Sequence, residues 1–478
     1  MPKNPTRSKR ESVRNIVVAL TLLSSSLLLV GSAVAYHDDA YDDVIRAFDV
    51  FRDDSGQFAT VNLAGDTNTK HNAFFQDLGT NGRRCVTCHQ QADAWTVTPE
   101  HVQDRFEKTD GTDPIFRPVD GANCSNLDFS TKHARRKNYS MLLSKGLIRI
   151  ELAVPANAEF TVRDNDNPYG CTDTQNISVY RRILPTTNIS FLSTVMWDGR
   201  ETLKDASGNF IPVRDDLTHQ AIDATLTHAQ GKNPPTAAQL KQIVDFETQI
   251  FTAQLHDRHA GDLNDDGGKG GPRALSKQYY YGGINDPLGG NPTGAPFSSV
   301  IFTLYDKWEN IKDRNYDEHT EARRSIAHGE ELFNTLQIPI VGVAGLNDAL
   351  NQPVINGFCG TCHDTPNVGH HSVPAPLNIG LTGLDRRTPD LPVITLMNNK
   401  SGELVQTTDP GRALITGKWA DVGKFKGPIL RGLAGRAPYF HNGSAATLLD
   451  AVEFYNTRFS LNLSARDKKD LVAFLKTL

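Results

Sequence analysis

Cysteine is scarce in this sequence. Only six cysteines occur in 478 residues, too few for a scaffold held together mainly by disulfides. Positive charge is not in excess either, because 50 Lys and Arg face 55 Asp and Glu, which gives a formal net charge of −5. We therefore expect no nucleic acid as a partner. The length and an ordinary composition, with 38% hydrophobic residues, allow two or three domains with sizeable cores.

Long apolar runs are almost absent, and the one that stands out lies near the start. Residues 16–30 are apolar apart from small polar residues, a basic stretch precedes them, and Ala33-Val34-Ala35 follows them. This order predicts a cleavable signal peptide over residues 1–35. The alternative is an uncleaved membrane anchor, for which the run is short. The segment holds five basic residues and one acid, so its removal takes the net charge from −5 to −9, which is compatible with a basic electron donor.

Four of the six cysteines lie in two matching pentapeptides, Cys85-Val86-Thr87-Cys88-His89 and Cys359-Gly360-Thr361-Cys362-His363. This is the attachment pattern of a c-type haem, in which two thiols bond to the porphyrin and the following His reaches the iron. A zinc site built from both cysteine pairs is the alternative, but the adjacent His in each copy argues against it. The sequence predicts two covalently bound haem c groups, with His89 and His363 as iron ligands.

The remaining cysteines are Cys124 and Cys171. An exported protein enters an oxidising compartment, so we expect a disulfide between them; two free thiols are the alternative. The export signal together with the haem motifs predicts a periplasmic location.

The pattern of helix signals around each haem motif predicts a mainly α fold with two cytochrome c-like helical domains, each carrying one haem. The predicted parts are residues 36–258, a Gly- and Pro-rich linker at 259–320, and residues 321–478. Within the linker, Asp262-x-Asn264-x-Asp266-Gly267 is similar to the start of a calcium loop, but its twelfth position is Arg273, where such a loop needs Glu. A turn-rich linker without metal is the preferred interpretation. The expected helices are residues 43–52, 71–78, 140–150, 236–255, 321–336, 448–455 and 468–478, one more begins at Pro99 after a Thr98 cap, and short strands are expected at 159–162 and 177–180.

Two further motifs accompany the haem pair. They are Trp197-Asp198-Gly199-Arg200, and Gly427 to Gly432 followed by Ala437-Pro438-Tyr439-Phe440-His441-Asn442-Gly443-Ser444. Together the three motifs resemble the bacterial dihaem cytochrome c peroxidase family, which includes MauG. The resemblance is specific in the last 60 residues and loose between the haems. It implies that hydrogen peroxide reacts at the N-terminal haem, that the C-terminal haem relays electrons, and that Trp197 lies between them; core packing is the alternative role for Trp197.

The chain departs from the family at the N-terminal haem. The family has a Gln and, ten residues later, a Glu that moves protons; here Gln220 matches the first and Gln230 stands at the second. Asp223 and His228 are nearby substitutes, and we favour His228 because imidazole transfers protons near neutral pH. The alternative is that His219 and His228 are surface residues. No His occurs between Ala134 and Thr218, where the family has a capping His, so this haem is predicted to be open in the resting protein.

A second departure concerns the C-terminal haem, where Tyr455 stands at the place of the family's axial Met. A phenolate ligand stabilises ferric iron, whereas a thioether raises the reduction potential. Tyr455 is therefore a candidate ligand of the second haem, as the resemblance to MauG implies. It could instead be a core aromatic, and Met397, His370 and His371 are the other candidate ligands.

The family also has a calcium ion between its haems. Arg181 and Arg182 occupy that neighbourhood here, and a cation is hard to place beside a guanidinium, so calcium stays open and disfavoured.

The resemblance implies a periplasmic haem peroxidase-type oxidoreductase. Its reductant would be a small cytochrome or a copper protein, or it would oxidise a protein substrate as MauG does. Two alternatives are a dioxygen-using dihaem oxygenase acting on an apolar substrate and a dihaem electron carrier without catalysis. The sequence leaves the reductant and the oligomeric state open.

Overall fold

The computed structural model describes residues 43–312 and 318–478. The predicted signal peptide lies outside these residues. Helix makes up 30% and strand 18% of the structure, so the prediction of a mainly helical protein is only partly confirmed. No helix in the described ranges has both the length and the apolar character needed to cross a membrane.

The first described segments of the chain are β-strands. β2 (Phe48–Asp53), β3 (Gly56–Asn62), β8 (Ile250–Asp257) and β9 (Gly261–Asp262) form an antiparallel sheet in the order β2-β3-β8-β9, and β1 (Val44–Ile45) pairs with β4 (Thr67–Asn68). The helix predicted at 43–52 is therefore wrong. Asp53 closes the β2–β3 turn by accepting hydrogen bonds from the amides of Ser55 and Gly56, and the apolar residues of β2 pair along β3.

The helices predicted from Pro99 and at 321–336, 448–455 and 468–478 are confirmed. Thr98 caps α2 (Pro99–Thr109) by accepting a hydrogen bond from the amide of His101, and Ser464 caps α11 (Ala465–Lys476) through the amide of Asp467. The other helices are α1 (Cys85–Cys88), α3 (Lys132–Asn138), α4 (Ser140–Lys145), α5 (Val213–Thr227), α6 (Ala237–Gln249), α7 (Pro272–Leu275), α8 (Glu318–Thr335), α9 (Ala413–Thr416) and α10 (Leu448–Arg458).

Three predicted helices are shorter than expected or absent. α4 ends at Lys145 because Gly146 adopts a left-handed conformation with φ 62°, and β5 (Leu147–Ala153) follows, paired with β7 (Asn176–Arg182). α6 ends at Gln249, where the β-branched and aromatic residues of β8 begin. The segment predicted as a helix at 71–78 contains the 3₁₀ turn Ala73–Phe75, which follows another at Thr69–His71.

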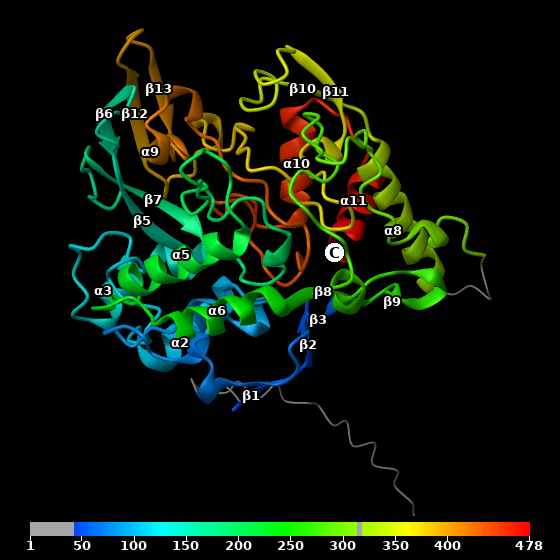
Figure 1. Ribbon diagram of the computed structural model, residues 1–478, viewed down its shortest axis with the longest axis horizontal. Coiled ribbons are helices and arrows are strands. Elements are labelled where there is room, and N and C mark those ends of the chain that lie inside the picture. Colours follow the sequence, from blue (N-terminus) through cyan, green and yellow to red (C-terminus); the bar gives the residue numbers. More distant parts are fainter. Residues whose placement is uncertain (1–42, 313–317) are drawn as a thin grey trace, which may run out of the picture. The chain divides into compact units, whose positions relative to one another are not determined.

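A three-stranded sheet joins segments that are far apart in the sequence. β6 (Phe160–Asp166) and β13 (Leu404–Thr407) flank β12 (Val393–Asn398), and Leu396 of β12 pairs with Val162 of β6. Figure 1 shows this sheet beside β5 and β7. The sheet links the two predicted haem domains, whose boundaries remain a prediction.

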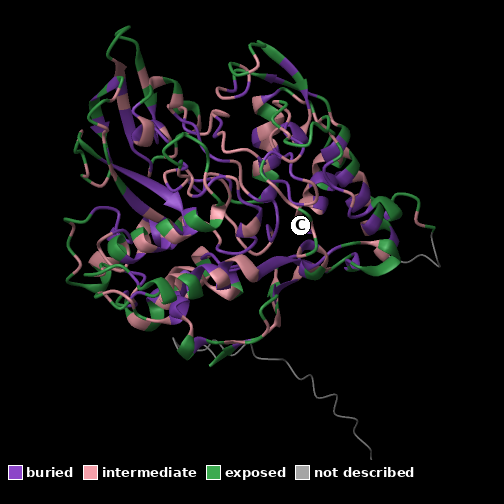
Figure 2. Cartoon of the chain, in the orientation of Figure 1, coloured by how far each residue is buried: buried purple, intermediate pink, exposed green. Residues whose placement is uncertain are grey.

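The core of the C-terminal part is built from α8, α10 and α11, which lie together in Figure 1. Phe302, Phe333 and Phe474 pack ring against ring at its centre, and the hairpin of β10 (Ile338–Val341) and β11 (Val354–Gly357) lies beyond it. The predicted linker contributes to this core, because Tyr305 and Trp308 are fully buried and stacked at 4.5 Å between ring centroids. Figure 2 shows that β3 and β8 are largely buried, whereas one side of α5 and α6 is exposed.

Cys124 and Cys171 are joined by a disulfide with 5.8 Å between their Cα atoms. The bond ties the turn-rich segment before α3 to the connection between β6 and β7.

Candidate active site

The first haem motif forms one helical turn, α1, followed by His89 in a non-helical conformation. The Nδ1 atom of His89 lies 3.2 Å from the carbonyl oxygen of Trp95. Burial lowers the pKa of His89 to about 4, so its imidazole is neutral and donates from Nδ1. This leaves Nε2 available to a metal, the usual arrangement of a metal-bound imidazole.

The second motif repeats this geometry. The Nδ1 atom of His363 lies 2.9 Å from the carbonyl oxygen of Gly369, and burial lowers the pKa of His363 to about 4. Burial also raises the pKa of the Cys359 and Cys362 thiols to about 12. Both cysteines are free in the structure, as are Cys85 and Cys88.

Each motif lines its own cavity. The first cavity, about 150 Å³, is lined by Cys85, Cys88 and His89 together with many charged and amide side chains. The second, about 230 Å³, is lined by Cys359, Cys362 and His363 and is mostly apolar. Two thiols and a neutral imidazole with a free Nε2 at each cavity are the donor set that a c-type haem requires, so the donor residues of both motifs fit the group.

Trp197 lines both cavities. Its indole Nε1 donates a hydrogen bond of 2.8 Å to the carbonyl oxygen of Arg182, which fixes the ring. The Nζ atom of Lys426 lies 5.6 Å from the ring centroid, and the ring of His441 meets it edge-on at 6.2 Å.

Gln220 and His228 both line the first cavity together with His89. Gln220 lies on α5, and His228 is the C-cap residue of that helix. The Nδ1 atom of His228 lies 2.5 Å from a carboxylate oxygen of Asp120, whose other oxygen lies 2.5 Å from Arg83. Burial alone would raise the pKa of Asp120, but Arg83 and His228 outweigh burial and hold it below its ordinary value.

The other polar candidates in this part of the chain do not line the first cavity. Asp223 and Gln230 are exposed. The His219 side chain is 51% exposed and contacts Glu201, with 2.5 Å between Nδ1 and a carboxylate oxygen. His228 is therefore the imidazole that α5 brings to the cavity.

Glu247 of α6 is a cavity residue that the sequence analysis missed. It lines the first cavity, one of its oxygens accepts a hydrogen bond from Thr186, and the other has no partner. Burial raises its pKa to about 7. Glu247 looks like an ordinary polar residue of an amphipathic helix, and its surroundings come from distant segments, so no local signal reveals it.

Tyr455 lines the second cavity with Cys359 and Cys362, and burial raises its pKa well above the ordinary value. The three other candidate ligands do not line either cavity in the described structure. Met397 lies in β12, His370 contacts Ser193, and His371 pairs with Asp364 at 3.0 Å.

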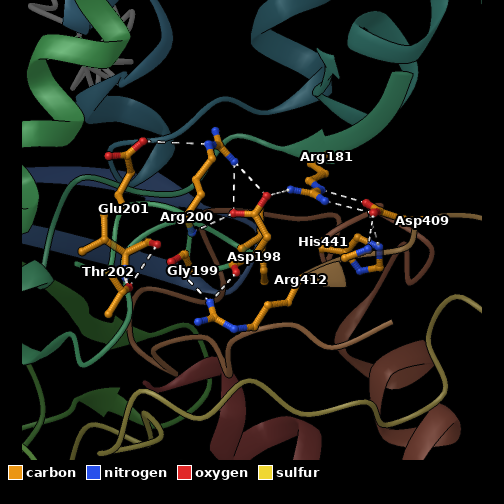
Figure 3. Close-up of polar contacts among 12 residues, drawn as sticks. Arg181, Asp198, Gly199, Arg200, Glu201, Thr202, Asp409, Arg412 and His441 are labelled. Carbon is orange, nitrogen blue, oxygen red and sulfur yellow. Dashed lines mark hydrogen bonds and ion pairs between the residues drawn. The ribbon is translucent and has the colours of Figure 1, made fainter. Parts of the chain in front are cut away.

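Figure 3 shows a buried charge network around Asp198, the residue that follows Trp197 in the sequence. Arg181 contacts Asp198 and holds both carboxylate oxygens of Asp409, at 2.7 and 2.9 Å. Arg200 also binds Asp198, at 3.1 Å. Burial would raise the pKa of Asp198, but the two guanidinium groups lower it to about 2. Among the described residues, no group of three or more His, Cys, Asp and Glu side chains is arranged to hold a metal.

The sequence is similar to curated peroxidases. It is 36% identical over 132 residues to the "Cytochrome-c peroxidase IdrP2" of Denitromonas iodatirespirans, which covers 26% of this chain and 36% of that one. It is 34% identical over 149 residues to the "Cytochrome c551 peroxidase" of Nitrosomonas europaea, covering 28% and 36%, and 30% identical over 201 residues to the IdrP2 of Pseudomonas sp. strain SCT, covering 41% and 50%. Over these segments the chain is similar to bacterial cytochrome c peroxidases.

The match to these cytochrome c peroxidases spans between a third and a half of their length. Among solved structures, a "MauG-like protein associated with microbial copper homeostasis" is similar at a TM-score of 0.38 and 16% identity, with 85% of each chain covered. No family model matches the chain.

Proposed function

We propose that the protein is a periplasmic dihaem cytochrome c peroxidase. Its N-terminal haem would be held by Cys85, Cys88 and His89, and its C-terminal haem by the matching residues of the second motif. The observation that carries the proposal is that Trp197 lines both cavities, because an aromatic ring next to both groups is placed to pass an electron between them. A c-type haem with an open coordination position supplies peroxide reduction when bound.

Several polar and charged side chains in the lining of the first cavity support hydrogen peroxide as the substrate. Asp120 holds Nδ1 of His228, so Nε2 of His228 is the nitrogen left to take a proton from peroxide and return it to the leaving oxygen. The amide of Gln220 would orient the substrate. A long apolar substrate, as an oxygenase would use, fits less well beside Arg83, Asp120 and Arg200.

The proposed peroxidase also needs a reductant. A small cytochrome or a copper protein would deliver electrons to the C-terminal haem, and a protein substrate of the MauG kind is the alternative. A mature chain with net charge −9 favours a basic donor.

The proposal is tested first on the purified ferric protein by electron paramagnetic resonance. One high-spin and one low-spin signal, both diminished by stoichiometric peroxide, are expected. Two low-spin signals that peroxide leaves unchanged would contradict an open reactive haem. Replacing Tyr455 with Phe should change the signal of the second haem if the phenolate is its ligand and leave it unchanged if Tyr455 only packs.

The role of His228 has a matched control on the same helix. His228→Gln should lower peroxide turnover by roughly 100-fold or more, the usual contribution of a general acid–base group. His219→Gln keeps a hydrogen-bond donor for Glu201 and should leave turnover unchanged. Equal activity of the two variants would remove His228 from the mechanism.

A dihaem electron carrier remains the second candidate because His228 and Met196 both line the first cavity and either could occupy the iron. Carbon monoxide should bind the reduced protein of a peroxidase, whereas a carrier with both irons six-coordinate should not bind it.

A further inference from the structure

Three cationic side chains, two of them buried, lie near Trp197 without an ion-pair partner among the described carboxylates. Arg182 and Lys426 are buried, and Arg436 is half-buried with an Nε atom that has no hydrogen-bond partner. Arg182 donates to the carbonyl oxygens of Lys145 and Arg436, at 2.9 and 3.2 Å, and Arg436 donates to that of Ile429. No ion pair with an acidic side chain involves any of the three within the described residues. Their partners are therefore neutral.

This arrangement is costly for the protein alone. Burial of a charge without an opposite charge is strongly unfavourable. Burial lowers the pKa of Arg182 and Arg436 to about 10, and burial together with Arg436 lowers the pKa of Lys426 to about 7. Arg181, the neighbour of Arg182 in the sequence, shows the opposite situation, since it is paired with two carboxylates. The three cations lack the anions that Arg181 has.

The three cations line the cavities of the haem motifs, so a group bound in those cavities would supply the missing anions. Arg182 lines both haem cavities. Lys426 and Arg436 line the second cavity and also a smaller space that Trp197 and His89 line. All three therefore lie where the surroundings of the two haem motifs meet.

We propose that Arg182, Lys426 and Arg436 form a cationic cradle for the propionate carboxylates of the haems. A haem carries two such carboxylates, which must be accommodated in or beside its cavity and which form charge-assisted hydrogen bonds with guanidinium and ammonium groups. The inference rests on the proposed function, because it requires haem in these cavities. Beyond the proposed function, it names the residues that would bind the propionate edge of each haem and that set the local charge.

The proposed cradle predicts that removing one of its positive charges lowers a haem reduction potential. Positive charge near a haem favours the reduced state, which carries one positive charge less, so Arg436→Gln, Lys426→Met and Arg182→Gln should each lower the midpoint potential of at least one haem. Spectroelectrochemical titration of the holoprotein measures this. Arg436→Lys keeps the charge and should keep the potential. The propionate bands in resonance Raman spectra should shift in Arg436→Gln.

The matched control is Arg431→Gln. Arg431 is also buried, with two guanidinium nitrogens that have no partner, but it is not among the described residues that line the cavities. Its replacement should leave both potentials unchanged.

The outcomes separate this inference from the proposed function. Wild-type protein without covalent haem would contradict the proposed function. Neutral variants that carry two haems at unchanged potentials would overturn the cradle alone, as would a shift equal to that of Arg431→Gln. A wild-type potential that depends on added chloride would show an exchangeable small anion in the cradle and would also overturn it. If the neutral variants do not fold, the propionate bands of Arg436→Lys are compared with those of the wild type. Bands at the same positions in both proteins would overturn the cradle.

Discussion

Arg181 forms ion pairs with two buried carboxylates. Asp198 and Asp409 are fully or almost fully buried, and Arg181 contacts both (Figure 3). Removing one partner of a buried ion pair leaves an uncompensated charge, so Arg181→Met should lower the free energy of unfolding by roughly 3–5 kcal/mol. Guanidinium unfolding of the holoprotein measures it. Arg163→Met is the control, since Arg163 is exposed on β6, and it should change stability by less than about 0.5 kcal/mol.

Glu247 predicts a pH dependence of stability. Burial raises its pKa from 4.5 to about 7, so the folded protein keeps a proton that the unfolded chain has already released. The retained proton therefore stabilises the folded protein fully below pH 4.5, and this stabilisation is lost as the pH rises to about 7. The free energy of unfolding changes by an amount on the order of 3 kcal/mol across this range. Glu247→Gln cannot release a proton, so the difference in unfolding free energy between wild type and variant should change across this range. A difference that is constant from pH 4.5 to 7 would show that Glu247 is already ionised.

At the scale of elements, the Cys124–Cys171 disulfide connects two segments 47 residues apart in the sequence. Closing a loop of this length restricts the unfolded chain, and loop-entropy arguments give about 4 kcal/mol. Cys124→Ala with Cys171→Ala should therefore lower the unfolding free energy by an amount of this order while leaving the haem content unchanged. The change in guanidinium midpoint upon reduction of the wild type should match that of the double variant. A midpoint that does not move would mean that the bond contributes nothing.

The sequence predicted elements best where a local signal decides them. Thr98 and Ser464 cap helices because their hydroxyls satisfy free amides, and this depends only on neighbouring residues. The segment 43–52 was misread as a helix because its apolar residues fit either period, and only pairing with distant β3 makes it a strand. For the site, the resemblance to the peroxidase family led to Gln220 and His228, whereas Glu247 becomes a cavity residue only through packing against segments far from it in the sequence.

At the scale of the whole molecule, the two haem motifs line different cavities with different cysteines. We therefore expect Cys359→Ser with Cys362→Ser to reduce the chain from two covalent haems to one, measured by intact mass and by the haem-to-protein absorbance ratio. The reciprocal change at Cys85 and Cys88 should do the same. A variant that loses both haems would show that the second attachment depends on the first.

The pairing of β6 with β12 has a consequence for how the protein is made. β6 leaves the ribosome long before β12, which lies between β6 and β13 in the finished sheet. Until then β6 presents unsatisfied backbone groups along a free edge, a template for association with other nascent chains. A product that terminates before Val393 would keep that edge permanently, so prematurely ended chains should collect in aggregates and require chaperone or protease clearance even though the first haem motif is intact.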